Sequence, residues 1–328
     1  MKKTLTFLTA LLFCAALFSR PIKKQAKDGA AFNDINAVEF KASQPQAEYD
    51  VFTIGENTQS YTAERFVSPF CMNAYETTYN LWYICRIYGE QNGYTFANPG
   101  QEGSGGKRGA APTALGCYQP VTMINWYDAA VWCNALSEMS GTKPCYVLDG
   151  KVLKDSTDTA ALDKCQCDWS ADGWRLPTET EWEYAARKTA KGFQNGALAS
   201  GQTDDSVTEG DVAWFDANAS ETHVVGTAGT VFTKDEQPAP GSGRANASGL
   251  YDMSGNVLEF CWDWLADYKE TDGVERAQGP AFGKERVCRG GSWSPYTGFI
   301  YCGDRYGYDP NERFNFMGFR FCKSLPTE

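Results

Sequence analysis

The segment at residues 294–317 constrains the fold of this chain more than any other feature of the sequence. It has neither a helical nor an alternating hydrophobic pattern, and its glycine, aspartate and asparagine residues are typical of turns. Aromatic residues make up 14% of the whole chain but about twice that share of this segment, at Tyr296, Phe299, Tyr301, Tyr306, Tyr308, Phe314 and Phe316. Such a composition is typical of recognition loops, where aromatic side chains supply contact area with few rotatable bonds. The alternative is that these side chains fill a core, and composition alone does not decide between the two.

Two short motifs frame this segment. RVCRGGSW precedes it at residues 286–293, and GFRFC follows it at residues 318–322. Both motifs have the character of strands or strand ends. We therefore expect the rest of the chain to form a scaffold that holds the segment between them.

The N-terminus has the features of a secretory signal peptide. Lys2 and Lys3 precede an apolar run that is shorter than the roughly 20 residues of a membrane-spanning helix. No later stretch is apolar enough to span a membrane, so we expect no transmembrane helix in the mature chain. The predicted location is the cell surface or the periplasm, with Cys14 as a candidate lipid-attachment site. We predict three parts, namely a signal peptide, a linker or tail, and a single domain, at residues 1–19, 20–48 and 49–328.

The charge of the chain argues against a nucleic-acid partner. The net charge is −11, and loss of Lys2 and Lys3 with the signal peptide would change it to −13. An acidic chain with only 30 lysine and arginine residues lacks the basic surface that binds phosphate backbones or anionic lipids.

The cysteines allow more than one interpretation. In an exported protein, disulfides are the default expectation. The pair Cys165 and Cys167 resembles half of a metal site, but no second pair and no histidine lies near it in the sequence. We interpret this pair as either a loop disulfide or two free thiols. His223 is the only histidine in the chain, which argues against histidine-rich iron or zinc centres.

Three segments have the apolar spacing and the end signals of helices, at residues 77–88, 125–141 and 173–187. In the third segment, Thr178 and Glu181 have the spacing of a capping box. Long stretches without regular patterns connect these segments, so we expect a fold with few regular elements.

Six motifs, in their order along the chain, resemble the formylglycine-generating-enzyme family, also called the sulfatase-modifying factors. They are PVTMINWYDAAVWCNALS, GWRLPTETEWEYAAR, DVAWFDANAS, SGLYDMSGNVLEFCWDW, RVCRGGSW and GFR. The resemblance extends from about Val51 to Cys322. It implies an α+β fold, a variant of the C-type-lectin fold with small twisted antiparallel sheets, two main helices and much irregular chain.

The resemblance also provides a test for catalysis. Enzymes of this family oxidise a substrate cysteine to formylglycine with two copper-binding cysteines, which suit soft Cu(I). These cysteines lie two and seven residues after the aromatic residue that corresponds to Trp293, where this chain has Pro295 and Ile300. Cys302 lies two residues beyond the second position and has no partner at the first. We therefore expect neither enzymatic activity nor copper binding.

A non-catalytic branch of the family, the variable proteins of diversity-generating retroelements, resembles this chain more closely. The chain matches the spirochaete type, with its R-x-x-x-x-P-x-x-R run, at Arg305, Pro310 and Arg313. The resemblance implies that residues 294–317 form a hypervariable recognition surface. The residues expected to contact the ligand are Ser294, Tyr296, Gly298, Phe299, Tyr301, Gly303, Asp304, Tyr306, Gly307, Tyr308, Asp309, Phe314, Asn315 and Phe316.

The resemblance implies one further site, for calcium. Family members bind calcium through a loop that matches residues 252–259. Asp252 and Glu259 would supply carboxylate ligands, and Gly255 and Val257 would supply backbone carbonyls, which are the hard oxygen donors that Ca²⁺ prefers. The alternative is that the two carboxylates only cap turns.

The sequence thus predicts an exported or surface-displayed ligand-binding protein without catalytic activity, whose partner is an unknown protein or surface ligand. Two alternatives stay open, a formylglycine-generating oxidase with displaced cysteines and a structural envelope protein. On the ligand-binding interpretation, the seven aromatic side chains of residues 294–317 should form one contiguous face that is largely exposed to solvent.

Overall fold

The computed structural model describes residues 42–46, 50–55, 62–203, 206–231, 238–268 and 278–326. The predicted signal peptide, Cys14 and most of the predicted linker lie outside the described residues.

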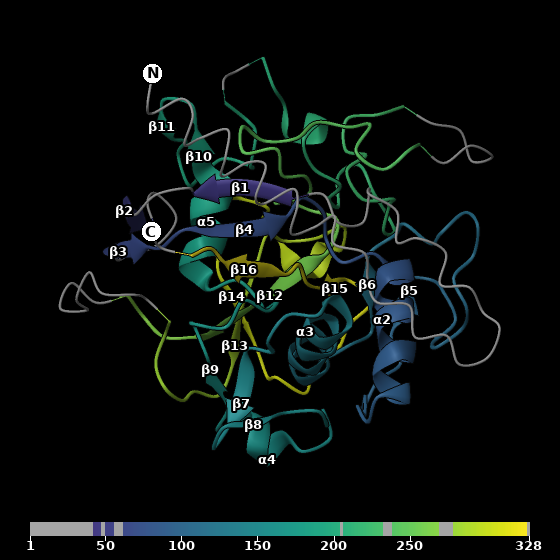
Figure 1. The fold of residues 1–328 in the computed structure, drawn as a ribbon. Helices are drawn as coiled ribbons and strands as arrows, with labels where there is room; N and C mark the ends of the chain where they lie inside the picture. The colour runs from purple at the N-terminus through teal and green to yellow at the C-terminus, as the bar shows by residue number, and fades with distance from the viewer. Residues whose placement is uncertain are drawn as a thin grey trace, which may run out of the picture.

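Two long helices and one shorter helix form where the sequence predicts them, and they are α2 (Tyr79–Gln91), α3 (Trp126–Ser140) and α5 (Glu179–Arg187). Side chains cap all three at their first turns, and α3 and α5 both begin with a complete capping box. Helices α2 and α3 pack side by side, and α5 lies at the other side of the sheets (Figure 1). A fourth helix, α4 (Thr159–Leu162), is a single turn.

A four-stranded sheet connects both ends of the segment at residues 294–317. Its order is β14-β13-β12-β15, with β12 at Leu258–Trp264, β13 at Arg286–Arg289, β14 at Tyr306–Tyr308 and β15 at Met317–Gly318. Strand β13 pairs antiparallel with both neighbours, whereas β12 and β15 run parallel. This parallel pair departs from the predicted antiparallel sheets, because residues 309–316 carry the chain from one edge of the sheet to the other.

A three-stranded sheet contains part of the predicted linker. Strand β1 (Ala42–Gln46) pairs antiparallel with β4 (Phe70–Asn73), which also pairs with β16 (Cys322–Ser324). The linker predicted at residues 20–48 therefore does not extend to its expected end. Pairing with β1 gives β4 a neighbour on both sides, so its backbone groups are not left at an open edge.

The other described elements are short. They are the pairs β2 (Asp50–Ile54) with β3 (Ala63–Val67), β5 (Gln101–Glu102) with β6 (Val121–Thr122), and β10 (Lys188–Thr189) with β11 (Gly192–Phe193), the sheet β8-β7-β9 (Lys151–Val152, Tyr146–Leu148, Gln166–Cys167), and the 3₁₀ turns η1 (Glu209–Asp211) and η2 (Pro295–Thr297).

The main core lies between α2, α3 and the strands that frame the segment. Trp82 and Trp132 stack with ring centroids 5.9 Å apart, and Phe319 of the GFR motif meets both rings edge-on. All three side chains are fully buried. The motif that closes the segment is therefore fixed in the core, which gives the segment a rigid end.

Candidate functional site

The segment at residues 294–317 starts with a tight turn after β13. Gly290 and Gly291 have φ angles of 95° and 67°, in the left-handed region that favours glycine. A Cβ atom on Gly291 would lie 2.4 Å from the carbonyl oxygen of Phe299. Only glycine allows the chain to fold back this closely, so the GGSW motif sets the path of the first loop.

We call residues 294–299 the tip of the segment. The tip contains η2, and the Ser294 hydroxyl accepts a hydrogen bond from the Tyr296 amide at 3.4 Å. The side chains of Tyr296 and Phe299 are 83% and 62% exposed. Two large aromatic side chains thus face solvent only three residues apart.

Hydrogen bonds from Tyr306 and Ser292, which lie outside the tip, fix the backbone of the tip. The Tyr306 hydroxyl accepts from the Phe299 amide at 2.9 Å and donates to the Thr297 carbonyl. The Ser292 and Thr297 hydroxyls lie 2.9 Å apart, within hydrogen-bond distance. Burial raises the pKa of Tyr306 to about 12, so its hydroxyl stays protonated at neutral pH. The side chains of Tyr296 and Phe299 are thus exposed, whereas the backbone of the tip is fixed by hydrogen bonds.

We call residues 306–316 the root of the segment. Tyr308 meets Phe314 edge-on at 5.7 Å, and Phe314 stacks on Phe316 at 4.9 Å. Phe316 is only 7% exposed and belongs to the main core, and the Leu258 amide donates to its carbonyl at 2.9 Å. The root is therefore packed onto the scaffold at both of its ends, whereas Asp309 and residues 311–313 between them are exposed.

Arg305 anchors the segment between tip and root. Its guanidinium donates to both carboxylate oxygens of Glu179, the first residue of α5, at 2.5 and 2.7 Å, and to the Ala266 carbonyl at 2.9 Å. Burial alone would raise the pKa of Glu179, but Arg305 and Arg289 outweigh it and lower that pKa. Because this bidentate pair is half-buried and has a defined geometry, it fixes the position of Arg305 and of the residues on either side of it.

The prediction that all seven aromatic side chains face solvent is wrong. Tyr296 and Phe299 are exposed, and Phe316 is buried. The half-buried members are Tyr301, Tyr306, Tyr308 and Phe314. The reason is the sheet, because β14 and β15 bring the root against the core while the tip has no strand partner.

The other predicted contact residues divide in the same way. Gly298 and Asp309 are exposed, and Asp304, Gly307 and Asn315 are half-buried. Ser294 and Gly303 are buried, because Ser294 bonds within the tip and the Gly303 amide donates to the Gly196 carbonyl at 2.8 Å. Buried residues at these two positions are available to a ligand only if the segment rearranges.

The sequence reasoning missed four exposed residues of the segment, which are Pro295, Asn311, Glu312 and Arg313. The last three lie in a turn in which the Asp309 carboxylate accepts from the Asn311 amide at 2.9 Å. Aspartate two residues before asparagine with proline between them is a turn signal, so this exposed turn was detectable in the sequence.

All four residues of the predicted calcium site are buried, and the carboxylate of Glu259 already has other partners. Both carboxylate oxygens of Glu259 accept from Arg320, at 2.6 and 2.7 Å, and one also accepts from the Trp182 indole at 2.9 Å. Asp252 accepts from the Gly226 amide through one oxygen, and its other oxygen has no hydrogen-bond partner among the described residues. Burial raises the pKa of Asp252 to about 6. These carboxylates do not fit a calcium ion unless the Arg320 pair breaks.

The two positions that hold the copper-binding cysteines in the family differ in their exposure to solvent. Pro295 is exposed and Ile300 is buried. Cys302, the displaced candidate, is fully buried, and burial raises the pKa of its thiol to about 12. A thiol with such a pKa is protonated at neutral pH and is a poor nucleophile and metal ligand.

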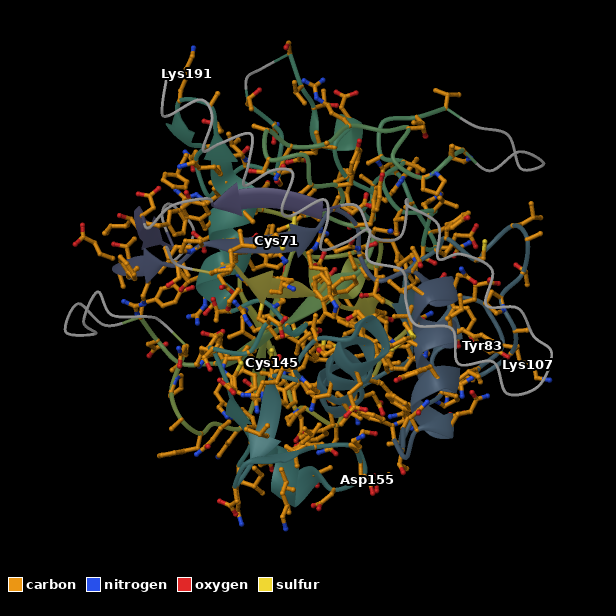
Figure 2. The ribbon with its side chains drawn as sticks, in the orientation of Figure 1. Cys71, Tyr83, Lys107, Cys145, Asp155 and Lys191 are labelled. Carbon is orange, nitrogen blue, oxygen red and sulfur yellow. The ribbon has the colours of Figure 1, made fainter. Side chains whose placement is uncertain are left out.

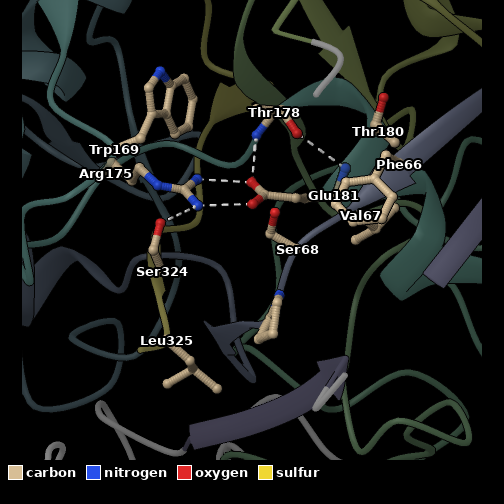
Figure 3. Close-up of a pocket in the computed structure, with 11 residues that line it drawn as sticks. Phe66, Val67, Ser68, Trp169, Arg175, Thr178, Thr180, Glu181, Ser324 and Leu325 are labelled. Atoms are coloured by element: carbon tan, nitrogen blue, oxygen red, sulfur yellow. Dashed lines mark hydrogen bonds and ion pairs between the residues drawn. The ribbon is translucent and has the colours of Figure 1, made fainter. Parts of the chain in front are cut away.

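A cavity of about 40 Å³ lies on the side of the scaffold where β3, α5 and the C-terminal residues meet. Figure 3 shows Arg175 and Glu181 paired along its wall, with Ser324 beside Arg175. The volume suits a few water molecules, whereas small-molecule sites are typically about 300–1,000 Å³. This cavity therefore offers no room for a substrate.

The fold and the framed segment define the class of protein, an α+β domain with the C-type-lectin fold of the formylglycine-generating-enzyme type. The chain belongs to the family described as the sulfatase-modifying factor enzyme 1-like domain, which it matches over residues 39–325. The predicted family and fold class are thus confirmed. Within the part of the chain that the structure describes, no helix has the length and apolar character to cross a bilayer.

Individual relatives give a finer comparison. The chain is similar to the solved structure of Treponema denticola variable protein 1, with a TM-score of 0.65 and 30% identity over 87% of this chain and 95% of that one. It is 34% identical over 184 residues to the chaperone protein LppX of Paenibacillus barcinonensis, covering 53% of this chain and 59% of the relative. It is 31% identical over 169 residues to the formylglycine-generating enzyme of Mus musculus, covering 49% of this chain and 42% of the enzyme. The chain thus spans about half the length of these two curated relatives.

Proposed function

We propose that this chain is a non-catalytic binding protein whose ligand contacts the tip, residues 294–299, and the exposed turn at residues 309–313. The observation that carries the proposal is the exposure of Tyr296 and Phe299 on a loop whose backbone is held by hydrogen bonds from behind. An aromatic side chain on a pre-ordered loop gains contact area with little loss of conformational freedom.

The similarity to a variable protein supports a narrower version of the same proposal. Substitution of exposed side chains usually changes the free energy of unfolding by less than about 0.5 kcal/mol, whereas core positions do not tolerate it. We infer that sequence variation is concentrated in the tip and in the turn at residues 309–313, and that the rest of the root is constrained by packing. Export, with display at the cell surface or in the periplasm, belongs to the same proposal and rests on the sequence of residues 1–19.

The test is a binding experiment with a matched control pair. The purified full-length protein is applied to an array of immobilised glycans and extracellular proteins, and the double variant Tyr296→Ser/Phe299→Ser is compared with it. The control is Phe282→Ser/Leu115→Ser, because these side chains lie elsewhere in the chain and are 84% and 62% exposed, close to the values of the tip pair.

We expect the tip variant to lose at least about tenfold in binding signal, since a few central aromatics usually dominate an interface. The control pair should keep the signal of the parent. If the two pairs lose the same signal, the contact is nonspecific, and if the tip pair loses none, the tip is not the binding surface.

The oxidase alternative has its own readout. Because Pro295 and Ile300 replace the two thiols and Cys302 is buried, we expect no aldehyde on a cysteine-containing sulfatase-type peptide incubated with the protein and copper. Stoichiometric Cu(I) binding together with aldehyde formation would overturn the non-catalytic assignment.

A further inference from the structure

Residues 143–172, between α3 and α5, are a polar insertion that contains β7, β8, α4 and β9. Two cysteines come together where β7 begins and β9 ends, which we call the base of the insertion. Strand β7 pairs antiparallel with β9, with Tyr146 opposite Cys167, and the Asp168 amide donates to the Cys145 carbonyl at 2.8 Å. This pattern makes Tyr146 and Cys167 a narrow, non-hydrogen-bonded pair, with Cα atoms about 4.5 Å apart. Cys145, one residue earlier, then lies diagonally across from Cys167, with Cα atoms roughly 6 Å apart, within the spacing of disulfides. In a regular ladder their side chains would point to opposite faces, but Cys145 precedes β7 and Cys167 ends β9, and both thiols lie near the Arg175 charge. Figure 2 shows Cys145 where β7 joins the body of the molecule.

The side chains at this position also interact. A hydrogen bond from the Cys167 thiol is the largest influence on Cys145 and lowers its pKa, and Arg175 and the Gly173 amide lower it further. Gly173 comes this close because it has no side chain, since a Cβ atom there would lie 2.0 Å from the Lys143 carbonyl oxygen. Burial raises the pKa of Cys167. Cys145 is thus the thiol that forms a thiolate more readily.

The alternative pairing within the insertion is geometrically worse. Cys165 and Cys167 are two residues apart, and an extended backbone between them would place their Cα atoms about 6.8 Å apart, at the far limit for a disulfide. The diagonal positions of Cys145 and Cys167 across β7 and β9 are closer. The loop disulfide considered from the sequence therefore has a better candidate partner, one that lies 22 positions before Cys167 in the chain.

We propose that Cys145 and Cys167 form a disulfide that closes the insertion at its base, made by exchange with an external disulfide such as glutathione disulfide or the disulfide of an exported oxidoreductase. Cys167 is half-buried and Cys145 is 1% exposed, so the oxidant meets Cys167 first. The Cys167 thiol loses its proton to solvent and attacks one sulfur of the oxidant, whose S–S bond breaks and releases the first thiol. The Cys145 thiolate then attacks the Cys167 sulfur of the mixed disulfide and displaces the second thiol.

The exchange is balanced. Two cysteine thiols lose two electrons and two protons, and the oxidant leaves as two thiols that carry them. The new bond encloses residues 146–166, so that β7, β8, α4 and β9 become one covalent loop. Closing a loop of this length in the unfolded chain stabilises the folded state, mainly because it restricts the unfolded ensemble.

The experiment maps the bond and measures its effect. The full-length protein is equilibrated with oxidised glutathione, its free thiols are alkylated without reduction, and its disulfides are mapped by mass spectrometry. We expect a Cys145–Cys167 link that persists in Cys165→Ser and is absent in Cys167→Ser. We also expect dithiothreitol to lower the Tm of the oxidised protein by about 5–10 °C.

The Tm measurement includes its own control. Cys145→Ala and Cys167→Ala should melt at the same temperature with and without dithiothreitol, and this comparison within one variant does not depend on how much the substitution itself destabilises. A Cys165–Cys167 link, full alkylation of Cys145 after oxidation, or an equal effect of dithiothreitol on parent and Cys167→Ala would each overturn the proposal. None of these outcomes bears on ligand binding at the tip.

Discussion

The tip and the root of one segment have similar compositions but different surroundings. Both contain aromatic residues among residues that favour turns, and both lie between the same two framing motifs. The tip exposes Tyr296 and Phe299, whereas the root packs Tyr308, Phe314 and Phe316 against the core. The difference arises because β14 and β15 pair the root with the central sheet. Aromatic content therefore identifies the segment, but strand pairing decides which aromatics a ligand can reach.

The largest effect should come from removing a root aromatic. We expect Phe316→Ala to lower the free energy of unfolding by about 3–5 kcal/mol, because it leaves a cavity in the main core. Phe299→Ala in the tip should change it by less than about 0.5 kcal/mol. Urea unfolding of the two variants measures both values, and equal losses would contradict the distinction between tip and root.

The next effect should come from the anchor between them. Arg305→Ala removes both hydrogen bonds to the buried Glu179 carboxylate, and we expect a loss of about 2–3 kcal/mol, somewhat below the usual cost because Arg289 lies 3.6 Å from the same carboxylate. Arg313→Ala, at an exposed position of the same motif, is the matched control. If the two arginine variants are equally stable, Arg305 does not anchor the segment.

Asp263, which lies next to the Glu179 partner of Arg305, should make the free energy of unfolding depend on pH. Asp263 accepts from the Glu179 amide at 2.7 Å, and burial, then the Glu179 charge, raises its pKa to about 8. In the unfolded chain the pKa of aspartate is about 3.9, so between these values the native state holds a proton that the unfolded state has lost. Stability contributed by this proton is present below about pH 4 and is lost as the pH rises through 8.

This dependence is measurable as a slope. We expect the contribution of Asp263 to the free energy of unfolding to fall by about 1 kcal/mol per pH unit between pH 5 and 7, near the limit for one proton, and it is measured as the difference in slope between the parent and Asp263→Asn because other groups also titrate in this range. Asp263→Asn keeps a neutral side chain at all pH values and should flatten the slope, whereas Asp309→Asn at the exposed turn should not. Parallel slopes for parent and Asp263→Asn would show that Asp263 is ionised in the folded protein.

A smaller effect should come from removing the hydroxyl that fixes the backbone of the tip, because this leaves the exposed aromatic side chains of the tip unchanged. Tyr306→Phe removes the hydroxyl that bonds to the Phe299 amide and the Thr297 carbonyl, and we expect a loss of about 1 kcal/mol. Amide hydrogen exchange at residues 297–300 should become faster in this variant and stay unchanged in Tyr308→Phe. Unchanged exchange in both variants would mean that the tip keeps its conformation without this hydroxyl.

Local signals in the sequence were enough for the helices and for the frame of the site. The capping box of Thr178 and Glu181 lies within four consecutive residues, so its formation depends on no distant part of the chain. The burial of Phe316 depends on the parallel pairing of Leu258 with Met317, and the meeting of Cys145 and Cys167 depends on the register of β7 and β9. Neither pairing leaves a periodic pattern in the sequence, because β15 and β9 are only two residues long. The resemblance to a family supplied the fold, but not the exposure of single side chains.

Calcium should have the smallest effect of all. The predicted site needs two carboxylates, but Arg320 and Trp182 bind the oxygens of Glu259, which leaves only one oxygen of Asp252 without a hydrogen bond among the described residues. A ligand that binds only the native state raises the Tm in proportion to its affinity, so a closed site should give almost no shift. We expect the Tm in millimolar calcium and in chelator to agree within about 1 °C, in the parent and in Asp252→Asn alike. A rise of several degrees in the parent that is absent in Asp252→Asn would show that calcium displaces Arg320 from Glu259, and it would restore the calcium site that the sequence predicts.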